Sequence, residues 1–152
     1  KERQRFTVHA PAYYEKMLET LGAGDAPVPA RCEARLFVAR YNGKVRAANI
    51  VISYGDTVTY LHGASSDKDH EVMAPYLLHW MTMLWAKKCG FRWYDLWGVA
   101  PLGAPRHALM SVTRFKEGFG GAMVSYPGTF EIPLCRFWYL FIRLHRRVRH
   151  LV

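Results

Sequence analysis

Cysteine is scarce in this sequence, and the three residues present, Cys32, Cys89 and Cys135, stand far apart. An odd number of cysteines without a C-x-x-C pair argues against a disulfide framework and against a cysteine-ligated metal site. The seven histidines show no metal-ligand spacing either, because they fall in different predicted elements. We therefore expect no metal, and a reducing, cytoplasmic setting.

Long apolar runs are also missing, since no stretch reaches the roughly 18 uncharged apolar residues that a membrane-spanning helix needs. The sequence starts at Lys1 without an initiator methionine or a signal peptide, so we expect a fragment or one half of a larger protein. The 152 residues are nevertheless 51% hydrophobic and 14% aromatic. They are enough to bury a core, and we expect one domain over residues 1–152.

Acidic residues are missing from the C-terminal segment 133–152, which contains five arginines. The formal net charge is +9, so subtracting these five leaves about +4 for the rest of the chain. Periodicity predicts a basic amphipathic helix over 136–150. Its apolar face comprises Phe137, Leu140, Phe141, Leu144, Val148 and Leu151. Such a helix suits packing on protein, an anionic membrane surface or nucleic-acid phosphates; packing is the interpretation that we favour.

The rest of the pattern predicts a helix, a three-strand meander, a helix, a strand, a short helix and two short strands before the final helix. Asn42-Gly43 is a strong hairpin signal between two β-prone segments. The expected helices are 10–22, 71–89 and 111–118, with a loop over 24–31. The expected strands are 35–41, 44–54, 57–62, 91–97 (a central strand), 119–125 and 129–132.

This order of elements predicts an α/β protein with a mixed sheet flanked by helices. It is also the order of a GNAT-like domain, the acyl-CoA N-acyltransferase fold, in which two neighbouring strands separate and donor and acceptor meet in the gap. Strands 57–62 and 91–97 would then flank the site. In helix 71–89, one apolar face of the kind that packs on a core contains Met73, Tyr76, Leu77, Trp80 and Leu84.

Three segments resemble the FemABX aminoacyltransferases, and the resemblance runs from about residue 35 to 140. The first is Tyr-Leu-His-Gly-Ala-Ser-Ser at 60–66, and the second is 76–98, ending in Trp-Tyr-Asp-Leu-Trp-Gly. The third and most specific is Arg-Phe-Lys-Glu-Gly-Phe-Gly-Gly at 114–121. Members of this family usually contain two GNAT-like domains, and this chain resembles the second, so an N-terminal GNAT-like domain is expected to be missing.

The resemblance implies an acyltransferase of cell-wall synthesis that uses aminoacyl-tRNA as co-substrate and has no bound cofactor. Its acceptor would be an amine of a peptidoglycan precursor, either a UDP-linked or a lipid-linked muropeptide. The setting would be the cytoplasm or the inner face of the plasma membrane, with contact through the C-terminal helix. The donated amino acid is not readable from the sequence.

Two residues of the third segment are the candidate catalytic residues that the resemblance implies. Lys116 would place a cation beside the oxyanion that forms when an amine attacks the ester carbonyl. Phe115 would be an aromatic wall next to it. The structural alternative is an exposed lysine on a short helix, with Phe115 in the core.

Three further residues are candidates for substrate binding. Tyr60 lies on a strand expected to face the cleft and has a polar tip suited to a substrate contact, although a half-buried structural tyrosine is the interpretation that we favour. Arg114 would bind phosphate or the acceptor, or else lie on the surface. Asp95 is a carboxylate within an apolar strand, so it is expected to be buried and paired, tying down a neighbouring loop; its alternative role is to accept the proton of the attacking amine.

An ordinary CoA-dependent acetyltransferase is disfavoured by segment 63–71. CoA-using members bind pyrophosphate through a glycine-rich loop that opens a helix. This segment lacks the paired glycines and contains Asp67, Asp69 and Glu71. An acyl-thioester enzyme with another amine acceptor remains the first alternative, and a non-catalytic module that binds tRNA or membrane is the second.

Overall fold

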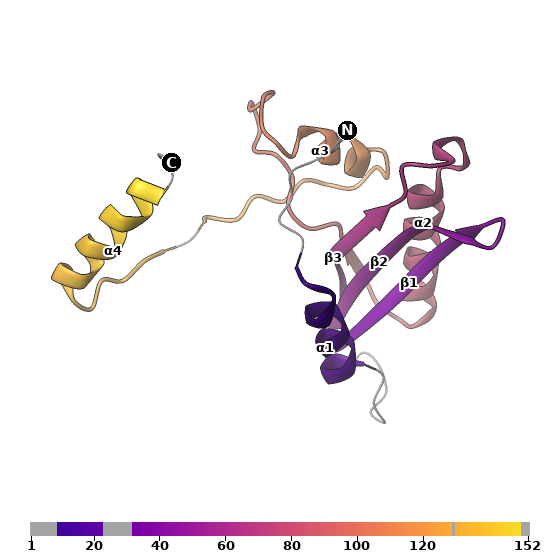
Figure 1. Cartoon of the computed structure of the whole chain (residues 1–152), viewed down its shortest axis with the longest axis horizontal. Helices are drawn as coiled ribbons and strands as arrows, with labels where there is room; N and C mark the ends of the chain where they lie inside the picture. The colour runs from indigo at the N-terminus through magenta and orange to yellow at the C-terminus, as the bar shows by residue number, and fades with distance from the viewer. Residues whose placement is uncertain (1–8, 23–31, 129, 150–152) are drawn as a thin grey trace. The chain divides into compact units, whose positions relative to one another are not determined.

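The structure is a computed structural model that describes residues 9–22, 32–128 and 130–149, with side chains described as far as His145 (Figure 1). The chain divides into two compact units, Lys1–Phe119 and Gly120–Val152, and each is described by itself. The first unit contains α1 (Pro11–Leu21), β1 (Glu33–Tyr41), β2 (Lys44–Tyr54), β3 (Thr57–Ser65), the 3-10 helix η1 (His70–Val72), α2 (Ala74–Lys88), β4 (Trp93–Asp95) and α3 (Met110–Glu117). The second contains α4 (Arg136–Arg149). The predicted loop 24–31 lies outside the described residues.

The sheet has four strands in the order β1-β2-β3-β4. The first three strands form the predicted antiparallel meander, and β3 pairs with β4 in parallel. Helix α2 packs on one face of the three long strands, and α1 contacts β1 (Figure 1). The predicted mixed α/β sheet flanked by helices is therefore confirmed.

Hairpin β1–β2 closes at the predicted dipeptide, where both residues adopt positive φ angles. The values are 49° for Asn42 and 73° for Gly43. This left-handed pair matches the right-handed twist of the flanking strands, and asparagine and glycine tolerate it best. The turn fixes the register that brings Phe37 opposite Asn49.

Two expectations about strands are wrong. Strand β4 has three residues and lies at an edge of the described sheet, so the predicted central strand 91–97 is mostly loop. Over 119–128 and 130–132 the chain forms no strand. A strand forms only where a neighbour offers backbone partners, and a three-residue edge strand offers few.

Helix α2 turns the opposite face to the sheet from the one that its periodicity predicts. Leu77, Trp80 and Leu84 are 57%, 56% and 42% exposed. The buried residues of the helix are Ala74, Leu78, His79, Thr82 and Ala86. Small residues let the helix axis approach the sheet closely, so the large side chains of the predicted face are left outside.

The core lies between α2 and the sheet. One cluster contains Val51, Val58, Ala86 and Phe91, with Trp85 packed against it. Buried Thr82 donates its hydroxyl to the Leu78 carbonyl at 2.8 Å, which satisfies it inside the helix. Among the described residues, no helix combines the length and the apolarity needed to cross a bilayer.

Candidate active site

The candidate site lies where β3 and β4 part. Their parallel pairing covers three residue pairs and ends at Thr59 and Asp95. Tyr60 is the next residue of β3, which continues to Ser65, whereas β4 ends at Asp95. The two strands expected to flank the site are thus neighbours that separate directly before Tyr60.

Asp95 holds the loop that leaves β4, which is the structural role that the sequence predicted for it. Its Oδ1 accepts a hydrogen bond from the backbone N–H of Trp97 at 2.7 Å, and Trp97 adopts a positive φ of 64°. The expectation that Asp95 is buried is wrong, because this side chain is exposed. A three-residue strand at the edge of the described sheet leaves this carboxylate in solvent.

The same loop is hydrogen-bonded to α3 through Thr113, which is 3% exposed. The Thr113 hydroxyl accepts a hydrogen bond from the Ala100 N–H at 2.8 Å and donates to the Leu109 carbonyl at 2.9 Å. Loop and helix are thereby held together.

Replacing Thr113 by valine is expected to lower the free energy of unfolding by about 1–3 kcal/mol, because the buried Ala100 N–H loses its acceptor. Chemical denaturation measures this change. Thr113→Ser, which retains the hydroxyl, is the matched control and should lose less. An unchanged free energy of unfolding in Thr113→Val would show that the hydrogen bond to Ala100 contributes nothing to stability.

Lys116 points inward from α3 and is 6% exposed, so the alternative of an exposed lysine is wrong. Its Nζ donates to the Gly98 carbonyl at 2.6 Å and lies 5.7 Å from the centre of the Tyr60 ring. Burial lowers the pKa of the Lys116 ammonium, and the negative charge of Asp95 acts in the opposite direction. The structure therefore brings together three of the five predicted residues: Lys116, Tyr60 and Asp95.

Phe115, the neighbour of Lys116 on α3, belongs to an aromatic cluster with Tyr76, His79 and Phe119. Its ring meets Tyr76 edge-on at 4.7 Å and His79 at 5.5 Å between centroids. Phe119 completes the cluster, 5.4 Å from Phe115. Such edge-to-face contacts fix ring orientations, so α3 is held against α2 and the Lys116 side chain is held in place.

His79 lies at the centre of this cluster and is a residue that the sequence analysis did not select for the site. Its Nδ1 shares a hydrogen bond of 3.0 Å with the Tyr94 hydroxyl, and its ring meets Tyr60 edge-on at 4.5 Å. Burial, and then the charge of Lys116, lowers the pKa of His79 to about 4. Burial raises the pKa of Tyr94, so the pair is neutral at pH 7.

Tyr60 is half-buried, and burial raises the pKa of its hydroxyl. Its hydroxyl lies over Gly63, where a Cβ atom would overlap it. A side chain at position 63 would therefore displace the Tyr60 ring from its place along β3. This close approach gives the glycine of the 60–66 segment a local structural reason.

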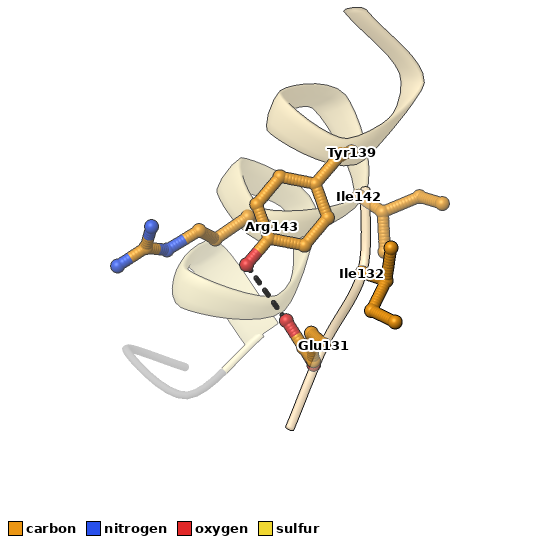
Figure 2. A pocket seen from close by; sticks show the side chains of 5 residues that line it. All are labelled: Glu131, Ile132, Tyr139, Ile142 and Arg143. Carbon is orange, nitrogen blue, oxygen red and sulfur yellow. Dashed lines mark hydrogen bonds between the residues drawn. The ribbon is translucent and has the colours of Figure 1, made fainter. Parts of the chain in front are cut away.

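Arg114 is exposed on α3, and no contact joins it to the other candidate residues in the part of the chain that the structure describes. A pocket of about 520 Å³ lies in the second unit, lined by Glu131, Ile132, Tyr139, Ile142 and Arg143 (Figure 2). None of the predicted site residues lines it. Within the described ranges, no three His, Cys, Asp or Glu residues gather as metal ligands.

Comparison with known proteins identifies the family of this chain and several relatives. A family model described as the FemAB family matches residues 30–147. The chain is 26% identical over 104 residues to the aminoacyltransferase FemB of Staphylococcus epidermidis, and equally to the FemB proteins of two strains of that species. The match covers 68% of this chain and 25% of the relative, so the matched region is about a quarter of the length of the curated relatives.

Proposed function

Because this chain belongs to the FemAB family, we propose that it forms part of an aminoacyltransferase that adds an amino acid to a peptidoglycan precursor. The donor is an aminoacyl-tRNA, and the acceptor is an amine of the muropeptide. The relatives of this chain are named aminoacyltransferases. The whole enzyme includes a further GNAT-like domain, which is consistent with a match to 25% of the relative's length.

The observation that carries the proposal is the buried ammonium group of Lys116. An ammonium that is 6% exposed and lies 5.7 Å from the centre of the Tyr60 ring is a costly feature that a solvated lysine would avoid. An ammonium has three N–H donors, and the bond to Gly98 uses one of them. The remaining donors suit an oxygen that becomes negatively charged during reaction.

In the proposed reaction, the acceptor amine attacks the carbonyl carbon of the ester that joins the amino acid to the tRNA ribose. A C–N bond forms, the ester C–O bond breaks, and the proton lost by the amine ends on the ribose oxygen. Lys116 stabilises the intermediate oxyanion, and its burial beside the Tyr60 ring strengthens that interaction. Tyr60 and Phe115 give the ammonium a fixed position.

An acyl-thioester donor is disfavoured by the chain between β3 and α2. Asp69 forms an ion pair with Arg46, and Met73 adopts a positive φ of 51° directly before α2. Proline is present in the first turn of α2, at Pro75, so one N–H donor is lost where a pyrophosphate would bind. These features support a reaction without CoA.

A mixing experiment with the full-length protein tests the proposed function. The protein is incubated with a muropeptide precursor and either charged tRNA or acyl-CoA, and the product is identified by mass spectrometry. We expect a precursor extended by one amino acid with charged tRNA alone. Product from acyl-CoA alone would identify the protein as a thioester-dependent acyltransferase, and no product from either would support a binding module.

A further inference from the structure

The second unit presents a helix with one bulky apolar stripe. Helix α4 places Phe137, Leu140, Phe141 and Leu144 at the spacing of one helix face. These residues are 71%, 61%, 58% and 64% exposed. Four large apolar side chains on one exposed face are unusual on a surface that has no partner.

The chain just before α4 packs on a different side of this helix. The Tyr139 hydroxyl donates to the Glu131 carboxylate at 2.7 Å, and Ile132, Ile142 and Arg143 line the pocket next to that bond (Figure 2). Tyr139 and Arg143 are four residues apart, so they share a side of the helix that the apolar stripe does not occupy. The segment that is bound to α4 within this unit therefore leaves the stripe uncovered.

Charge decides which kind of surface fits the stripe. Segment 133–152 contains five arginines and no acidic residue, and the side chains of Arg136 and Arg143 are exposed. Trp138, also exposed at 59%, adds an aromatic ring of the type that prefers a membrane interface. An apolar stripe bordered by cations is complementary to a layer with an apolar interior and anionic headgroups.

We propose that α4 binds an anionic lipid surface, lying parallel to it with the Phe137–Leu144 stripe inserted among the acyl chains. A helix of 14 residues extends about 21 Å, which is too short to cross a hydrocarbon core of about 30 Å. The helix therefore lies in the interface. This binding does not depend on the proposed transfer reaction and is measured without it.

Vesicle flotation with the full chain tests the proposal. Vesicles of phosphatidylcholine, with or without phosphatidylglycerol, are floated on a density gradient, and the bound fraction of protein is measured. We expect binding to the anionic vesicles that falls at least tenfold when the salt concentration rises from 0.1 to 1 M, because the Debye length shrinks from about 10 to 3 Å.

Two variants and a matched control separate the contributions. Leu144→Glu should lower the partition coefficient at least tenfold, since it removes an apolar group from the stripe that inserts into the lipid and adds a negative charge. Arg136→Gln combined with Arg143→Gln should lower it about thirtyfold, because each arginine near the surface contributes about 1 kcal/mol. Leu102→Glu makes the same chemical change at a residue that is 85% exposed in the first unit, and it should leave binding unchanged.

Three results would overturn the proposal. Equal binding to neutral and anionic vesicles, or no binding to either, would remove the anionic lipid surface as partner. Loss of thermal stability in Leu144→Glu but not in Leu102→Glu, without lipid, would show that protein covers the stripe. RNA that displaces the protein from vesicles, and that binds through the arginines but not through Leu144, would identify a nucleic-acid contact instead.

Discussion

Replacing Lys116 by methionine is expected to slow aminoacyl transfer by about 10²–10³-fold, the usual effect of removing one donor from an oxyanion site. Methionine has a similar length and fills the space beside Tyr60 and Phe115, so the variant tests the charge. The turnover rate of full-length protein with charged tRNA and a muropeptide precursor measures the effect. The loss should appear in kcat, because the oxyanion exists in the transition state and not in the ground state.

Lys88→Met is the matched control, because this lysine is exposed in the last turn of α2. It should retain the rate of the unmodified protein. Circular dichroism and thermal unfolding establish that Lys116→Met remains folded despite losing its bond to Gly98. A folded Lys116→Met variant with unchanged turnover would remove Lys116 from the mechanism and would favour a non-catalytic binding module.

Local signals predicted most of the first unit. Asn42-Gly43 fixed the first hairpin, and α1 and α3 begin and end within about a residue of the predicted bounds. The predicted strand 57–62 begins at the same residue as β3 and ends three residues before it. These features depend on neighbouring residues, which is why one sequence was enough.

The errors concern contacts between distant segments. The face of α2 that packs on the sheet contains Ala74, Thr82 and Ala86, because close approach of backbones outweighed the size of Trp80 and Leu84. A hydrophobic pattern ranks side chains by apolarity and does not record how near a helix can come to its sheet. The segments 119–125 and 129–132 had strand-like patterns, but no described strand pairs with them.

The sequence also predicted only part of the candidate site, because it does not record contacts between distant segments. The motif around Lys116 and Phe115 is contiguous, so resemblance was enough to select both residues. His79 and Tyr94 are 15 residues apart on different elements, and only the fold brings them within 3.0 Å. A usable signal was present: His79 and Thr82 are polar residues three positions apart on the face of α2 that contains small side chains.

His79 connects the catalytic proposal with the stability of the fold, because the same burial that shields Lys116 disfavours a second positive charge nearby. A protonated His79 would place a second positive charge near the Lys116 ammonium. The neutral imidazole instead shares its hydrogen bond with Tyr94 and packs against Tyr60. A neutral His79 leaves Lys116 as the charged group that the proposed mechanism uses.

Acidification should consequently destabilise the protein through His79. The pKa of this residue is lowered from 6.5 to about 4 in the folded protein, so below pH 6.5 the unfolded chain binds a proton that the folded chain does not. The stabilisation is complete above pH 6.5 and is lost as the pH falls toward about 4. Between pH 7 and pH 4.5 the free energy of unfolding should drop by about 2–3 kcal/mol through this group.

Urea denaturation of the native chain and of His79→Phe at the two pH values measures this contribution. Phenylalanine retains an aromatic ring beside Tyr60 but does not titrate, so the drop should be smaller in the variant by about 2–3 kcal/mol. His62, whose pKa burial also lowers, adds a loss of the same sign to both proteins and cancels in the comparison. Equal drops in the native chain and His79→Phe would mean that His79 binds a proton equally well in the folded and the unfolded protein. The site would then tolerate a second cation near Lys116.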